Sequence, residues 1–221
     1  MAARMLRDLA SVLILAGGLL LVDAGVTLVW QEPVTAVVGL IQRTQINQRF
    51  INAPVPPDER YALIRGSSPW QRVAYLARRE ARAVPTGAAV GRIAIPKLGV
   101  NFEFVQGTDD ASLHKGPGHY PATALPGLGE TMAIAGHRTT YLAPFRHLDA
   151  LHKGNRILLR MPYGRFTYVV QSSRIVPPTV LWVTRNVGYD RLVLSACNPL
   201  YSATQRIIVF ARLEQVVPAR V

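Results

Sequence analysis

From residue 90 onward the chain consists of short runs rich in β-branched and aromatic residues, separated by glycine and proline. Runs of this length, bounded by turn residues, are typical of β-strands. Roughly eight such strands with few helices between them predict an all-β fold, an eight-stranded closed or nearly closed barrel, rather than a βαβ sheet. The expected strands are Gly91–Ile95, Val100–Val105, Thr131–Ala135, Arg156–Met161, Arg165–Val176, Val180–Val183, Arg191–Ser195 and Arg206–Leu213.

The connections between these strands carry turn and helix signals. Pro162-Tyr163-Gly164 lies between two alternating runs and predicts a hairpin. Short helices are expected at Asp109–His114 and Pro144–Leu151, because each begins with a residue suited to a helix start. Before the barrel, Trp70–Val84 has the periodicity of a helix that packs on the domain.

An apolar run lies near the N-terminus. Residues Leu9–Trp30 contain one charge, Asp23, and as a helix they would span about 33 Å at ~1.5 Å per residue. Arg4 and Arg7 precede the run, which favours a cytoplasmic N-terminus and an exported remainder. Val22-Asp23-Ala24 is a poor cleavage site for a signal peptide. We therefore expect an uncleaved single-pass helix that anchors an extracytoplasmic domain to the cell membrane.

Between the apolar run and the barrel, Val34–Phe50 has an apolar face that suits an amphipathic helix at the membrane. Three prolines between Ile51 and Pro57 predict an extended linker. The expected segments are a cytoplasmic N-terminus, a transmembrane helix, a membrane-proximal helical and linker segment, and a folded domain, at residues 1–8, 9–30, 31–85 and 86–221.

The formal net charge of +12 is compatible with nucleic acid, an anionic membrane surface or a polyanionic wall as partner. No run of basic residues interleaved with aromatics is present, and no helix-turn-helix, zinc-finger or RNA-binding signature. No nucleic-acid partner is therefore expected. The histidines also lack metal spacing, since His147 and His152 are five residues apart and no HExxH or paired-cysteine pattern exists. No metal and no cofactor are expected.

Cys197 is the only cysteine, so it has no disulfide partner within the chain. It follows the apolar run Arg191–Ser195, and Asn198-Pro199 ends that strand. A thiol in this place is presented at the rim of a sheet. Arg206 begins the next apolar run nine residues later, and antiparallel pairing through this connection would make the two residues opposite or diagonal neighbours.

His137 follows another apolar strand, Thr131–Ala135, and Gly136 allows the backbone to turn between them. An imidazole can take the proton of a thiol and later give a proton to a leaving amine. An arginine can stabilise negative charge on a tetrahedral oxygen. Each residue alone more often has a structural role, but three of them at strand ends predict Cys197 as nucleophile, His137 as acid/base and Arg206 as oxyanion stabiliser.

The strand-end cysteine followed by Asn-Pro, the arginine that opens the next strand and the sequence Ala135-Gly-His-Arg-Thr139 resemble the sortases. The resemblance is closest to the class E housekeeping sortases of actinobacteria, and it extends from about Gly91 to Leu213. It implies an eight-stranded sortase-type barrel. It also favours His137 over His119, the other candidate base.

The resemblance implies a two-step transpeptidation. Cys197 would attack the Thr–Gly bond in a Leu-Ala/Pro-x-Thr-Gly sorting signal of a surface protein and form a thioacyl enzyme. An amine on a lipid-linked peptidoglycan precursor would then take the acyl group, which anchors the surface protein to the cell wall. Water as acceptor would give hydrolysis.

Five further residues are expected to contact the substrate. Tyr120 resembles a position linked to signal choice in class E enzymes, and Thr139 and Thr140 would line the same groove, although loop packing fits each of the three as well. Ser195 and Ala196 precede the nucleophile. The family usually has threonine at the position of Ala196, so a hydroxyl is expected to be missing from the site.

Three other functions fit parts of the pattern. A cysteine L,D-transpeptidase also pairs histidine with cysteine, but its signature places histidine, glycine and arginine tightly around the cysteine. A non-catalytic membrane-tethered module could hold anionic wall polymers through its charge. A pilin-polymerising class C sortase often has a C-terminal span and an N-terminal lid, whereas this chain ends at Pro218–Val221 without a span and Ser68-Pro69-Trp70 only faintly resembles a lid motif.

Overall fold

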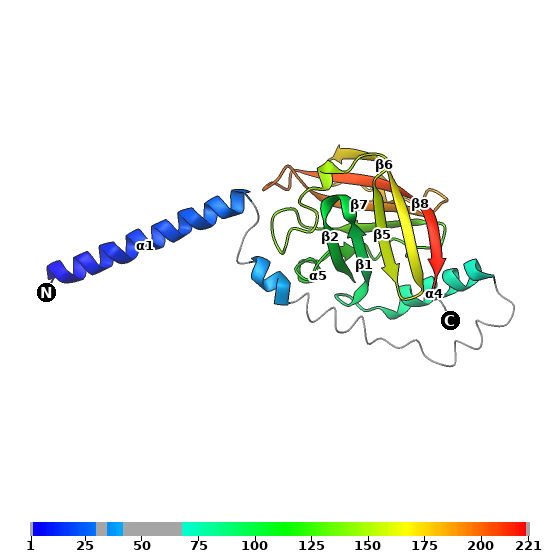
Figure 1. Ribbon diagram of the computed structural model, residues 1–221, viewed down its shortest axis with the longest axis horizontal. Helices are drawn as coiled ribbons and strands as arrows, with labels where there is room; N and C mark the ends of the chain where they lie inside the picture. Colours follow the sequence, from blue (N-terminus) through cyan, green and yellow to red (C-terminus); the bar gives the residue numbers. More distant parts are fainter. Residues whose placement is uncertain (1, 30–34, 42–67, 220–221) are drawn as a thin grey trace.

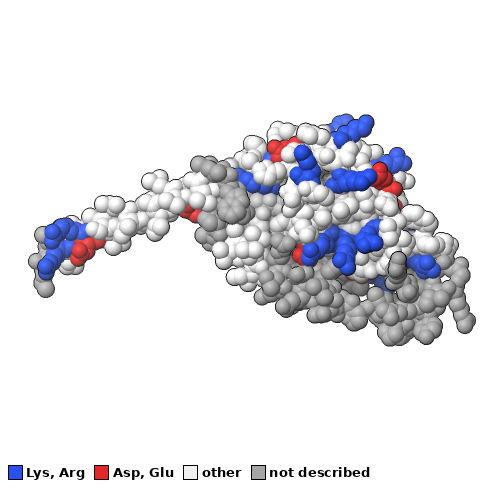
Figure 2. Space-filling view, viewed as in Figure 1, with Lys and Arg blue, Asp and Glu red and all other residues white. Residues whose placement is uncertain are grey.

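The computed structural model describes residues 2–29, 35–41 and 68–219. Helix α1 (Ala2–Val29) projects away from the β domain (Figure 1). Within its stretch Arg4–Thr27, a window of 18 residues has a mean hydropathy of 2.2 and is not buried inside the structure, so this stretch is a candidate membrane span. Figure 2 shows basic side chains at the free end of this helix, where Arg4 and Arg7 lie.

Eight strands close into a barrel in the order β1-β2-β3-β4-β7-β8-β6-β5. Neighbouring strands are antiparallel except for β2–β3 and β4–β7, which pair in parallel. The expected barrel is therefore confirmed. The strands are β1 (Ala89–Ile95), β2 (Val100–Gln106), β3 (Gly118–His119), β4 (Thr131–Ala135), β5 (Arg156–Met161), β6 (Gly164–Val176), β7 (Arg191–Asn198) and β8 (Gln205–Pro218).

One expected strand is wrong and one strand was not expected. Val180–Val183 does not form a strand, and the 3-10 helix η3 (Trp182–Thr184) lies in the β6–β7 connection instead. Pro177 and Pro178 precede it, and proline cannot donate a ladder hydrogen bond. The eighth strand is β3, which has no strand pattern in sequence and forms because β2 and β4 pair with it on both sides.

The helices agree with expectation in part. Helix α4 (Pro69–Ala83) begins with a capping box at Ser68. Helix α5 (Asp110–Leu113) is capped by the side chain of Asp109. Of the expected helix Pro144–Leu151 only the 3-10 turn η2 (Leu148–Ala150) forms. The remaining 3-10 turn is η1 (Pro96–Leu98).

The Pro144–Leu151 segment closes i→i+3 hydrogen bonds rather than the i→i+4 bonds of an α-helix, since the N–H of Leu148 donates to the Phe145 carbonyl and that of Ala150 to the His147 carbonyl. The N–H of Phe145 bonds to the carbonyl of His137, eight residues back, which ties the segment to the histidine loop. The prediction for Val34–Phe50 is testable only in part, since 35–41 is helical and the rest lies outside the described residues. The expected linker at 51–57 also lies outside them.

The barrel has an apolar interior and a second apolar layer on part of its outer face. Along β7, Leu192, Leu194 and Ala196 point into the interior cluster. Because successive side chains on a strand alternate between faces, Ser195 and Cys197 point outward. The outer cluster covers β4, β7 and β8 and consists of Ala133, Val176, Val183, Val193, Ile208 and Phe210.

Candidate active site

Cys197 and Arg206 lie directly opposite each other where β7 and β8 pair. Directly opposite side chains share one face of a sheet, so both face outward, in line with the outer apolar cluster. The thiol is reduced and partly exposed. The expected antiparallel pairing is confirmed.

His137 is brought to the same level by the parallel pairing of β4 and β7. Ala135 is the register partner of Ser195, and the N–H of Gly136 donates to the Ser195 carbonyl at 3.0 Å. His137 and Cys197 each lie two residues beyond this pair. A Cβ at Gly136 would approach the ring of Phe145 to 2.5 Å, so only glycine allows the turn that places the imidazole here.

Arg138 fixes the histidine loop to the end of β7, and the sequence analysis assigned it no role. Its side chain is buried, and its Nη1 donates to the carbonyl of Cys197 at 3.3 Å and to Asn198 Oδ1 at 3.0 Å. Its Nε donates to the Arg146 carbonyl at 3.1 Å, and its Nη2 pairs with Asp149 at 2.8 Å. A charged residue directly after the candidate base was the only sequence signal.

The imidazole of His137 lies in a partly apolar environment. Its Nε2 is buried and has no hydrogen-bond partner among the described residues. Burial lowers the pKa of His137, the nearby His114 lowers it further, and Asp110 raises it. A neutral imidazole is the form that can accept a thiol proton. No hydrogen bond joins it to Cys197 within the described ranges, a separation that is common before substrate binds.

The guanidinium of Arg206 lies at the start of β8. Its Nη1 donates to the carbonyls of Ala203 and Gln205, both at 2.9 Å. Its Nε and Nη2 make no hydrogen bond to the part of the chain that the structure describes.

The β6–β7 connection forms a wall beside this face. Trp182 stacks on Phe210 of β8, with ring centroids 6.0 Å apart. The buried Arg191 anchors this connection to the start of β7, since its Nη2 donates to the carbonyls of Val183 at 3.0 Å and Arg185 at 2.7 Å. Leu181 is 77% exposed, so the wall carries an apolar rim.

The residues expected to contact substrate separate into two groups. Tyr120 packs against the outer apolar cluster, and Ser195 lies on the same face as Cys197. Thr139 and Thr140 lie in the loop after His137 and are partly exposed. Ala196 instead belongs to the interior core, on the opposite face from the thiol. Its missing hydroxyl therefore removes no group from the outward face.

His119 is a structural histidine in the present arrangement. It is buried in β3, its Nδ1 lies 2.8 Å from Gln106 Oε1, and its Nε2 lies 3.1 Å from Thr123 Oγ1. Burial lowers its pKa to about 4. Both ring nitrogens are engaged, which leaves His137 as the candidate base.

Comparison with known proteins gives concordant matches. Residues 93–214 match the family model described as the sortase domain. Sortase D of Bacillus subtilis is 33% identical over 131 residues, which cover 58% of this chain and 65% of that protein. The chain thus spans less than two thirds of the length of the curated relatives first matched.

Solved structures show the same likeness. Sortase E from Streptomyces avermitilis is 33% identical with a TM-score of 0.56, over 61% of this chain and 93% of that one. Sortase E1 from Streptomyces coelicolor, solved with a tripeptide in its active site, is 26% identical with a TM-score of 0.58, over 60% and 91%. Since the family model covers more than half of the sequence, the chain belongs to the sortase family, with class E sortases among its neighbours.

Proposed function

We propose that this protein is a sortase transpeptidase that joins proteins carrying a Leu-Ala/Pro-x-Thr-Gly sorting signal to a cell-wall precursor. The observation that carries the proposal is the strand register. It sets Cys197 opposite Arg206 and brings His137 to the same level, on a face walled by the β6–β7 connection. Family membership supports it independently.

In the first step the Cys197 sulfur attacks the carbonyl carbon of the signal's threonine, while its proton passes to His137. The carbonyl oxygen becomes an oxyanion, and the free donors of Arg206 stabilise it. His137 then gives the proton to the glycine nitrogen. The C–N bond breaks, and a thioester to Cys197 remains.

In the second step an amine of a lipid-linked peptidoglycan precursor attacks the thioester. His137 takes a proton from the amine and returns it to the sulfur as the C–S bond breaks. The product is a new amide between surface protein and precursor. Water in place of the amine would release a free carboxylate instead.

The exposed apolar side chains of Leu181 and Trp182 in the β6–β7 connection suit the hydrophobic part of the signal. The outer apolar cluster, in which Val193 and Ile208 are buried, supports this connection, and Tyr120 packs against the cluster. Ser195, Thr139 and Thr140 carry hydroxyl groups close to the proposed reaction centre in sequence and register. The tripeptide held in the active site of the Streptomyces coelicolor relative supports a peptide substrate here.

The contact between the barrel and α1 supports a membrane-anchored acceptor. The hydroxyl of Tyr201 donates to the carbonyl of Thr27, near the end of α1. Tyr201 lies in the β7–β8 connection, between Cys197 and Arg206. With α1 as a single-pass span, the reaction centre lies close to the membrane surface on the extracytoplasmic side. A lipid-linked amine would be within reach there.

The test is a transpeptidation assay with the full chain in detergent micelles, a labelled Leu-Ala-x-Thr-Gly peptide and an amine acceptor. We expect Cys197→Ala to abolish peptide turnover, His137→Ala nearly to abolish it, and Arg206→Ala to lower it by roughly 10²–10³. Arg212→Ala is the matched control, because Arg212 lies on the same strand and face. Wild-type turnover in Arg206→Ala would refute the oxyanion assignment.

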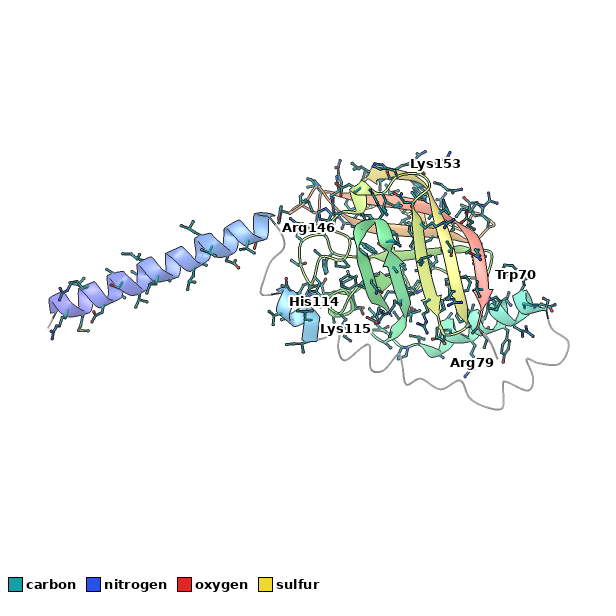
Figure 3. All side chains as sticks on the ribbon, viewed as in Figure 1. Trp70, Arg79, His114, Lys115, Arg146 and Lys153 are labelled. Carbon is teal, nitrogen blue, oxygen red and sulfur yellow. The ribbon has the colours of Figure 1, made fainter. Side chains whose placement is uncertain are left out.

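The competing functions make different predictions. A module that only binds wall polymers would bind them equally well as the Cys197→Ala variant. An L,D-transpeptidase would consume tetrapeptide stems rather than the sorting peptide. For a class C enzyme, Ser68-Pro69-Trp70 would have to cover the site. Ser68 instead caps α4, and Figure 3 shows Trp70 on the opposite side of the barrel from His114.

A further inference from the structure

Two stacked rings, those of His114 and Tyr141, lie against the proposed acid/base His137. The rings of His114 and Tyr141 are stacked, with centroids 3.9 Å apart and planes 19° apart. The ring of His137 lies 5.4 Å from Tyr141 and 6.4 Å from His114. Neither His114 nor Tyr141 is used in the two chemical steps above.

Two independent local structures bring these rings together. His114 is the C-cap of α5, a helix fixed by Ser112, whose N–H donates to Asp109 Oδ1 at 3.0 Å. Tyr141 starts a run of three non-glycine residues with positive φ, at 50°, 65° and 41°. Such a backbone costs about 1–2 kcal/mol per residue and persists only where its surroundings hold it.

The surroundings of Tyr141 do hold it. Its N–H donates to Thr35 Oγ1 at 3.1 Å, from the helix over 35–41. Leu142 packs within contact distance of Gly39 of that helix. Figure 3 shows His114 at this end of the barrel, next to the same helix. The membrane-proximal helix and α5 therefore both support the ring that lies against His137.

We propose that His114 and Tyr141 are positioning residues for His137: their stacked rings hold its imidazole at the level of Cys197, and His114 is one of two ionisable groups on and next to α5 that set the electrostatic surroundings of His137. This inference rests on the proposed function. At 6.4 Å between ring centroids, a proton on His114 repels a proton on His137.

The charged and titratable groups around His137 allow a two-sided test. On α5, Asp110 favours the protonated imidazole and His114 disfavours it. Tyr141 contributes a ring from the loop, and Cys197 and Arg206 face the site from β7 and β8. The helix over 35–41 carries no titratable side chain, and Arg138 and Arg146 are turned toward Asp149 and Tyr201.

The experiment follows the imidazole signal of His137 by NMR against pH, in the full chain in detergent micelles. We expect the midpoint to move to higher pH in His114→Gln and to lower pH in Asp110→Asn. The inflection of the kcat/KM profile should move in the same two directions. His152→Gln, which removes an exposed histidine that is not among these rings, should leave both unchanged. An unmoved His137 midpoint in His114→Gln overturns the inference.

The stacking contribution has its own pair of variants. Tyr141→Phe keeps the ring and should keep kcat/KM, whereas Tyr141→Leu should lower kcat/KM by about tenfold through a misplaced imidazole. Equal kcat/KM in Tyr141→Leu and wild type would remove Tyr141 from the proposal. The NMR midpoint is read without turnover, so an inactive wild type would refute the proposed function and leave the His114 coupling still measurable.

Discussion

His119 and His137 are the two candidate bases, and substituting them is expected to have opposite effects on stability and on activity. His119 is 1% exposed, and burial lowers its pKa from 6.5 to about 4. Between these pH values the unfolded chain binds a proton that the folded chain does not, so stability from this group is complete above about pH 6.5 and falls as the pH drops toward 4. Lowering the pKa from 6.5 to about 4 corresponds to roughly 3 kcal/mol of folding free energy.

The perturbation is His119→Gln, measured by urea unfolding of the full chain in detergent micelles at pH 7 and pH 4. Wild type should lose roughly 3 kcal/mol more than the variant between these values, because glutamine does not titrate. His119→Gln should keep turnover at pH 7 while it remains folded, and His137→Gln should lose turnover and stay stable. Equal acid sensitivity in wild type and His119→Gln would refute the burial argument, and lost turnover in a folded His119→Gln would reopen the choice of base.

Three further variants test the site. Gly136→Ala forces a methyl into the ring of Phe145 and should cost about 1–3 kcal/mol in urea unfolding, with partial rescue by Phe145→Leu; an unchanged midpoint would contradict the contact. Arg138→Met loses the bonds that tie the histidine loop to β7 and should lower stability by about 2–4 kcal/mol and reduce kcat/KM, whereas wild-type kinetics would show that the tie is dispensable. Tyr120→Leu should change the kcat/KM ratio of Leu-Ala- over Leu-Pro-type peptides by about tenfold, and an unaltered ratio would exclude Tyr120 from signal choice.

The barrel was predictable because most of its strands are independent patterns of alternating or continuous apolar residues. The pairing of Cys197 with Arg206 was also predictable, since a short connection between antiparallel strands fixes their register. β3 could not be found in this way, because two residues, Gly118 and His119, carry no periodicity and are ordered only by their neighbours.

The supporting parts of the site were harder to predict for the same physical reason. Arg138 bonds to the Cys197 carbonyl across 59 residues of sequence, and Tyr141 bonds to Thr35 across 106. Such contacts depend on tertiary packing rather than on local pattern. The direction of the Ala196 side chain has a different cause, the alternation of side chains along β7. Ala196 points into the core, and its neighbour Cys197 points outward.

The central claim is that Cys197 becomes acylated by the threonine carbonyl of a sorting signal, so that the amino-terminal part of the signal stays on the enzyme. Intact mass spectrometry of the full chain after incubation with a Leu-Ala-x-Thr-Gly peptide, without amine acceptor, tests it most directly. We predict an added mass equal to the Leu-Ala-x-Thr acyl group, located on Cys197, absent from Cys197→Ala and lost when an amine is added. Cleavage of the peptide by Cys197→Ala, or an adduct on any other residue, would contradict the account.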